Sequence, residues 1–222
     1  MQVVLSCACA SLGGTLAGAL AHRWATGLVG AGVPGARAAC LCCAAGWASA
    51  LWRLGPTIEA LELCALCVVL VTVSLTDLAA RVIPDPCTAC AAAIRLAHVA
   101  LVALWAPSEG LLLLGGSVVG AAVAFLPLLA VTLALDGRLG GEGMGGGDLK
   151  LFAVAGLHVG WRAFLLLLPV ACALGIAFAL VRERLTGEGD RTFPFGPPIA
   201  LSFWATLLAQ PHVEAWLAAW LF

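Results

Sequence analysis

Long apolar runs separated by short polar connections make up almost the whole chain. Most of these runs approach the roughly 20 residues that an α-helix needs to cross the hydrocarbon core of a bilayer. The pattern therefore predicts an all-α, polytopic membrane bundle of about eight transmembrane helices, the sixth of them short. The predicted spans cover 3–21, 38–54, 60–78, 88–106, 111–135, 149–161, 163–181 and 198–221.

Composition strengthens this prediction and removes two function classes. Of the residues, 63% are hydrophobic and 10% are charged, and the mean hydropathy is +1.07. Soluble domains are about half apolar and about a quarter charged, which makes a water-soluble enzyme a poor expectation. The net charge of −1 provides no basic field to hold a phosphate backbone. We therefore expect a lipid bilayer as a partner and no nucleic acid.

Basic residues are unequally shared between the two sides of the predicted bundle. With the N-terminus outside, eight Lys and Arg residues fall in cytoplasmic connections, and only Arg53 and Arg162 fall outside. An excess of Lys and Arg marks the cytoplasmic side. This orientation, in the inner (plasma) membrane, places the two longest polar stretches, 135–150 and 182–198, in the cytoplasm.

Arg95 falls inside a predicted span, about two turns from its start. A charge at that depth is costly and needs a partner or a watery cavity. From the sequence, we expect the long side chain to snorkel to the cytoplasmic interface rather than to serve catalysis.

Two acidic residues lie where a predicted span meets the cytoplasmic surface. Asp77 ends the run LCVVLVTVSLTD, just before two prolines that stop the helix, and Asp148 follows GMGGG at the start of a short helix. Two carboxylates from different helices can share a proton, so that one activates a water while the other protonates a peptide carbonyl. Taken singly, either residue could instead be an interfacial helix cap.

Four blocks, taken together, resemble the type IV prepilin peptidases, which are intramembrane aspartic proteases of the GxGD class. The resemblance covers roughly residues 60–215, and more faintly 13–23, and suggests N-terminal helices at 1–59 followed by a peptidase-like membrane domain at 60–222. In chain order, the blocks are Asp77 with IPD at 83–85, GMGGGDLKLFAVAG at 143–156, Gly160-Trp161, and PFGPPIAL at 194–201.

The resemblance implies that Asp77 and Asp148 are the catalytic pair of an endopeptidase. Its substrates would be prepilins or pseudopilins with a basic leader and a hydrophobic helix, cut after a Gly at the cytoplasmic face. The PFGP block would shape the substrate loop, or would simply start a helix at Pro197 or Pro198. The residues assigned to supporting the pair or the substrate loop are Asp85, Lys150, Gly143, Gly145, Gly147, Pro194 and Gly196.

The chain departs from the full-length bacterial enzymes in its first cytoplasmic connection. Those enzymes carry paired CxxC motifs there and methylate the new N-terminus with S-adenosylmethionine. Here the connection is only 24–39, and the nearby thiols are Cys40, Cys42 and Cys43. We therefore expect a peptidase-only form with no cofactor and no metal.

A second cysteine pattern has the spacing of a zinc ribbon, in which Cys64-x2-Cys67 is followed by Cys87-x2-Cys90. On a helix, however, Cys64 precedes Asp77 by 13 residues, or about 20 Å. Cys64 would then lie near the outer face and Cys87 near the inner one, too far apart to share one ion. We interpret the pattern as a coincidence.

Two alternatives remain at this stage. A transporter or channel-like protein would use Arg95 and the Gly-rich loop to line a pathway. An inactive scaffold of a pilus or secretion system would keep the fold alone. The sequence leaves the oligomeric state open.

Overall fold

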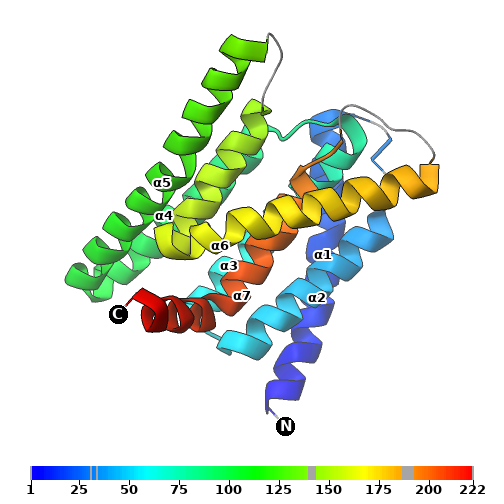
Figure 1. The fold of residues 1–222 in the computed structure, drawn as a ribbon. Coiled ribbons are helices and arrows are strands. Elements are labelled where there is room, and N and C mark those ends of the chain that lie inside the picture. The colour runs from blue at the N-terminus through cyan, green and yellow to red at the C-terminus, as the bar shows by residue number, and fades with distance from the viewer. Residues whose placement is uncertain (1, 31, 34, 140–143, 187–192, 222) are drawn as a thin grey trace. The chain divides into compact units, whose positions relative to one another are not determined.

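The computed structural model describes residues 2–30, 32–33, 35–139, 144–186 and 193–221. Within these ranges the chain forms helices and no strands, which confirms the all-α class (Figure 1). The seven helices are α1 (Gln2–Val29), α2 (Ala36–Leu54), α3 (Ile58–Ala80), α4 (Asp85–Trp105), α5 (Pro107–Leu139), α6 (Gly146–Thr186) and α7 (Gly196–Leu221).

Four segments of the described chain are long and apolar enough to cross a membrane. They are Ile58–Ala80, Asp85–Trp105, Pro107–Leu135 and Gly146–Leu185, in α3, α4, α5 and α6. Length and composition therefore support a polytopic membrane protein. The predicted number of about eight spans is not confirmed, because the described residues form seven helices and the sixth and seventh predicted runs both lie in α6.

Helix α6 is interrupted at Gly160. This residue has φ 74° and ψ 170°, outside the helical region, in a conformation that side chains with a Cβ rarely adopt. Figure 1 shows that α6 changes direction along its length. The boundary predicted near residue 162 thus corresponds to a kink between the two helical segments of α6.

The chain divides into two compact units, residues 1–98 and 99–222. The first contains α1, α2, α3 and most of α4, and the second contains the end of α4 with α5, α6 and α7. This division concerns packing, so the functional boundary expected between 59 and 60 stays a prediction.

In the first unit, α1 and α2 lie side by side because two glycines of α1 leave room for the backbone of α2 (Figure 1). A Cβ on Gly14 would come within 2.6 Å of the carbonyl oxygen of Cys43, and one on Gly18 would overlap the backbone of Cys40. Small residues four apart allow such close approach between membrane helices. The 13–23 block is thus a packing surface.

Helix α3 is connected to α1 and to α2 by hydrogen bonds to backbone carbonyls. The Thr72 hydroxyl of α3 lies 3.4 Å from the Ala21 oxygen of α1, and Trp47 Nε1 of α2 donates to the Cys64 oxygen at 2.9 Å. Such polar contacts fix helix positions where lipid supplies no hydrophobic driving force between helices. A small apolar cluster beside them is formed by Ala25, Val33, Ala39 and Leu75.

In the second unit, α5 and α6 cross at a pair of glycines. A Cβ on Gly120 would overlap the carbonyl oxygen of Gly156, and one on Gly156 would lie 2.7 Å from the Ala124 Cβ. The two backbones are therefore in direct contact, as they are at other small-residue crossings.

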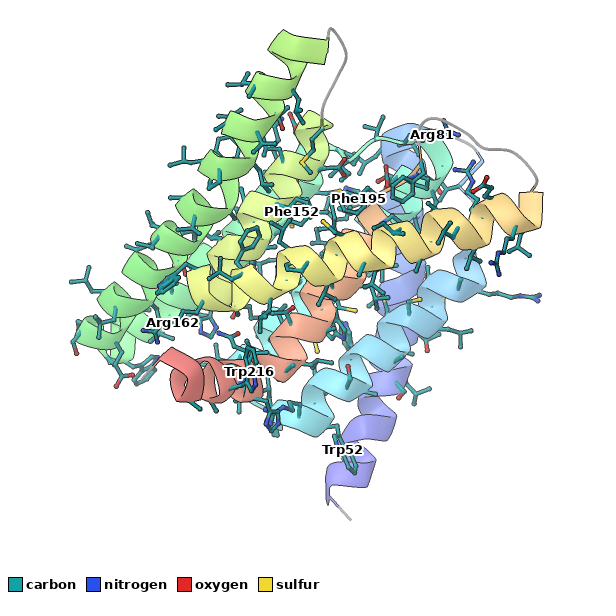
Figure 2. The ribbon with its side chains drawn as sticks, in the orientation of Figure 1. Trp52, Arg81, Phe152, Arg162, Phe195 and Trp216 are labelled. Carbon is teal, nitrogen blue, oxygen red and sulfur yellow. The ribbon has the colours of Figure 1, made fainter. Side chains whose placement is uncertain are left out.

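Some of the tryptophans lie near helix ends with much of their surface exposed. Trp52, close to the end of α2, is 70% exposed, and Trp105, the last residue of α4, is 84% exposed. Figure 2 shows Trp52 and, on α7, Trp216. These positions suit interfacial anchors, because indole rings favour the boundary between hydrocarbon and water.

Candidate active site

Asp77 lies in the last turn of α3 and is 5% exposed. Its backbone carbonyl accepts a hydrogen bond from Arg81 N at 2.9 Å, which closes the helix. Arg81 then turns the chain away with φ 56°, an uncommon value for a residue other than glycine (Figure 2). The helix ends at Ala80, within two residues of the predicted end at 78.

Asp85 begins α4 after a connection of only four residues, 81–84. Its side chain is exposed, and its carbonyl oxygen accepts a hydrogen bond from the Thr88 hydroxyl at 3.0 Å. Because the connection is so short, Asp77 and Asp85 lie at the same end of the α3–α4 pair. One carboxylate is buried and the other faces out.

Asp148 is the third residue of α6 and is partly exposed. Its Oδ2 lies so near Gly145 that a Cβ on that glycine would be 3.2 Å away. The Gly145 carbonyl accepts a hydrogen bond from Leu149 N at 3.2 Å, which starts the helix. The absence of a side chain at Gly145 thus leaves space that the Asp148 carboxylate fills.

The other residues assigned to this block have simpler positions. Gly147 is the second residue of α6, and Lys150 lies two residues after Asp148 with its side chain exposed. Gly143 lies outside the described residues.

The PFGP block does start a helix. Pro194 lies just before α7, Gly196 is the first residue of α7, and Ile199 N donates to the Phe195 carbonyl at 3.1 Å. Pro197 and Pro198 occupy the first turn, where a missing N–H leaves no hydrogen bond unmade.

The same block also packs beside the helix that carries Asp148. The rings of Phe195 and Phe152 lie 6.0 Å apart, centroid to centroid, and are tilted by 58° to each other (both are labelled in Figure 2). Phe152 is one turn beyond Asp148 on α6. The helix start expected at this block is therefore confirmed, and its role in shaping a substrate loop stays a prediction.

Sequence reasoning missed an aromatic cluster that makes this junction. Its members come from α6 and from the segment before α7, and aromatic pairs at these centroid distances add to the energy of burial. The available signal was the pair of Phe residues that flank Pro194. The cluster consists of Phe152, Phe164, Phe178, Phe193 and Phe195.

Asp77 and Asp85 thus belong to the first unit, while Asp148, Lys150 and the PFGP block belong to the second. Each unit presents one carboxylate of the expected pair at the end of a helix, next to a polar connection. Such groups can accept, hold and donate a proton.

Residues 64–180, just over half of the chain, match the type IV leader peptidase family, and this stretch contains Asp77, Asp85 and Asp148. The chain belongs to this family. The family inferred from the four sequence blocks is therefore confirmed. The match includes the first three blocks and ends before PFGPPIAL. The link of that fourth block to the rest of the site is therefore supported by the contact between Phe195 and Phe152 and not by the family match.

Relatives in the family carry the name prepilin leader peptidase/N-methyltransferase. The one from Pseudomonas putida is 32% identical over 165 residues, which are 74% of this chain and 55% of the relative. The one from Escherichia coli (strain K12) is 33% identical over 161 residues, 72% of this chain and 68% of the relative. The one from Aeromonas hydrophila is 36% identical over 111 residues, 48% and 37% of the two chains. No solved structure matches the chain.

The chain therefore spans about half the length of several leader peptidase relatives. The connection between the first two helices is also shorter than the sequence predicted. The structure shortens the first connection to the six residues 30–35, because α1 continues to Val29 and α2 begins at Ala36. The predicted connection of 24–39 was too long.

The zinc-ribbon spacing does not produce a cluster in the fold. Cys64 lies 16 residues before the end of α3, whereas Cys87 is the third residue of α4, after a short turn. A rise of 1.5 Å per residue separates Cys64 from that turn by about 24 Å. In the part of the chain that the structure describes, no three His, Cys, Asp or Glu side chains are grouped to hold a metal ion.

The prediction for Arg95 was wrong. Instead of reaching for the cytoplasmic end, Arg95 Nη1 lies 3.3 Å from Glu62 Oε1 on α3, and the Glu62 side chain is 6% exposed. The requirement for a partner, which the sequence did indicate, is met by Glu62. The signal for this pair was one acidic and one basic residue inside neighbouring apolar runs.

Proposed function

We propose that this member of the type IV leader peptidase family is an aspartic endopeptidase that removes the leader from prepilins or pseudopilins. Cleavage follows a Gly at the cytoplasmic face of the plasma membrane. The observation that carries the proposal is the family match over 64–180, because it contains two aspartates at helix ends next to polar connections. The relatives' printed name points to the same substrate class.

In the proposed mechanism, Asp77 and Asp148 meet across the substrate and hold one proton between them. The ionised carboxylate takes a proton from the attacking water, and the protonated one donates to the carbonyl oxygen. Collapse of the tetrahedral intermediate then breaks the C–N bond, and the leaving amine takes a proton from the pair. No metal, cofactor or covalent intermediate is needed.

The surrounding residues support the reaction by shape and charge. The open backbone at Gly145, with Gly143 and Gly147 beside it in sequence, lets an extended substrate approach Asp148 closely. Asp85 and Lys150 orient the carboxylates at their respective helix ends. Pro194 and Gly196 shape the substrate loop, which is consistent with the contact of Phe195 with Phe152.

We further propose that the new N-terminus leaves unmethylated. The six residues between α1 and α2 are too few for a zinc-binding loop with paired CxxC motifs. The transporter alternative loses its main support, because Arg95 is engaged by the buried Glu62. The scaffold alternative is left to experiment.

Co-expression with a prepilin in cells that lack their own leader peptidase tests the proposal. We expect loss of the leader on a gel, and mass spectrometry should show cleavage after the Gly with no methyl group. A prepilin whose Gly before the cut is replaced by a bulky residue should stay uncut. If well-inserted protein cleaves none of several prepilins, the scaffold reading replaces the peptidase; a methylated product contradicts the peptidase-only form.

Gly145→Ala should lower cleavage between about tenfold and a hundredfold. The new Cβ would lie 3.2 Å from Asp148 Oδ2, so the carboxylate has to move, and a misplacement of about 1 Å can lower the rate of catalysis about a hundredfold. Gly146→Ala is the matched control, because nothing lies within 4 Å of a Cβ there. Initial rates of leader removal compare the two. Equal rates would show that the space beside Asp148 is immaterial.

A further inference from the structure

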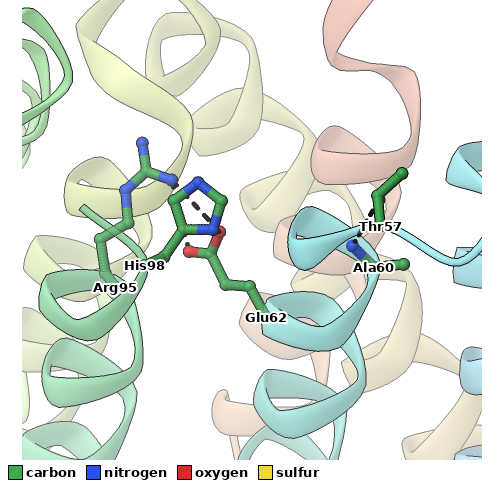
Figure 3. Close-up of polar contacts among 5 residues, drawn as sticks. All are labelled: Thr57, Ala60, Glu62, Arg95 and His98. Atoms are coloured by element: carbon green, nitrogen blue, oxygen red, sulfur yellow. Dashed lines mark hydrogen bonds and ion pairs between the residues drawn. The ribbon is translucent and has the colours of Figure 1, made fainter. Parts of the chain in front are cut away.

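Three ionisable side chains meet between α3 and α4 within the first unit (Figure 3). Arg95 Nη1 lies 3.3 Å from Glu62 Oε1 and 3.4 Å from Oε2. His98 Nδ1 lies 3.1 Å from Glu62 Oε2. The proposed peptidase mechanism uses none of these groups.

The cluster is buried in helices that are candidate membrane spans. The exposed fractions of the side chains are 6% for Glu62, 14% for Arg95 and 7% for His98, and both helices are apolar enough to cross a bilayer. Ionisable groups in such positions are expensive and therefore pair with one another. Separating Glu62 from Arg95 would leave a buried charge uncompensated, so the pair resists any turning of α3 against α4.

Glu62 and Asp77 are coupled by the geometry of one helix. Asp77 follows Glu62 by 15 residues on α3, which is about 22 Å along the axis and about 60° around it. A rotation of α3 that moves one side chain therefore moves the other in the same sense. The turn at 81–84 ties the Asp77 end to α4, and the Glu62 contacts tie the other end.

We propose that Glu62, Arg95 and His98 set the rotation and register of α3 against α4 and thereby position Asp77. They are positioning residues, and their catalytic consequence rests on the proposed function. The contact is made by the single nitrogen Nη1, which lies near both oxygens of Glu62, and not by a two-nitrogen fork. An ammonium can replace one such nitrogen, so Lys at position 95 should preserve the contact.

The register is tested without any substrate by the reactivity of two native thiols on α3. Cys64 is 6% exposed and Cys67 is 5% exposed, so turning α3 should uncover them. In detergent solution, N-ethylmaleimide labelling read by mass spectrometry should be several-fold faster at these thiols in Glu62→Gln and Arg95→Gln than in the wild type. The exposed Cys172 provides an internal reference.

Two variants make this test specific. Glu59→Gln applies the same change one turn earlier on α3, at an exposed side chain, and should label as the wild type does. Arg95→Lys should also keep wild-type labelling. If labelling is unchanged in both Glu62→Gln and Arg95→Gln, or if Arg95→Lys labels as fast as Arg95→Gln, the register role is overturned.

Kinetics with a prepilin test the positioning of Asp77. We expect kcat to fall about tenfold in Glu62→Gln with KM within about twofold, because substrate binding is kept while one carboxylate is displaced. The kcat of Arg95→Lys should be higher than that of Arg95→Gln and close to that of the wild type. This comparison tests the proposal even if Glu62→Gln does not insert into the membrane. An unchanged kcat with faster labelling overturns the positioning of Asp77. If the wild type itself cleaves no prepilin, the proposed function has failed. The labelling rates then still show whether Glu62 and Arg95 fix the register of α3 against α4.

Discussion

Asp148→Asn should lower prepilin cleavage by at least about a hundredfold, and Asp77→Asn should do the same. Asn is nearly isosteric with Asp but cannot take up or release the shared proton. The effect is large because either change removes half of a pair that acts as one unit, so combining the two changes should add little. Quantitative gel-shift rates on the two single variants and the double variant measure the loss.

The matched control for this experiment is Glu109→Gln. Glu109 is an exposed acidic residue in the first turn of α5, as Asp148 is an acidic residue in the first turn of α6. Its replacement should leave cleavage and membrane insertion unchanged. All variants should reach the membrane fraction at wild-type levels. A near wild-type rate for Asp148→Asn would remove the two-carboxylate mechanism, whatever the family.

The positions of most helices could be predicted from the apolar runs alone. The runs 60–78 and 88–106 became Ile58–Ala80 and Asp85–Trp105, an agreement within three residues. The first helix was predicted too short, because the predicted span ends at residue 21, just before the first charged residue, yet α1 continues to Val29. Helical hydrogen bonds do not require apolar side chains, and packing against a neighbouring helix stabilises a helix beyond its apolar run.

Which side chains meet could not be predicted in the same way. Glu62 and Arg95 are 33 residues apart, and their contact depends on how two helices are rotated about their axes. Apolar periodicity carries little of this information when a helix is apolar on all sides. The approach of Phe195 to Phe152 was missed for the same reason. The proposed catalytic pair, Asp77 and Asp148, was inferred from motif resemblance rather than from periodicity.

The largest effect on stability is expected for Gly120→Ala, at the crossing of α5 and α6. The added Cβ would overlap the Gly156 carbonyl oxygen and lie 2.8 Å from the Gly160 Cα. Overpacking usually costs about 1–3 kcal/mol, and backbone atoms cannot rotate away, so the upper end of that range applies. The midpoint of thermal unfolding in detergent should therefore fall well below that of the wild type.

Gly116→Ala separates this clash from the general effect of replacing a helical glycine. Gly116 is one turn earlier on α5, and nothing lies within 4 Å of a Cβ there. Because Ala is favoured over Gly in a helix by about 1 kcal/mol, this variant should be as stable as the wild type or more so. Of the two alanines, only that at position 120 should thus lower the midpoint. The same clash should also slow cleavage, because Gly156 follows Asp148 by eight residues on the same helical segment and would carry Asp148 with it if displaced. Equal midpoints for the two variants would mean that α5 and α6 are not in backbone contact.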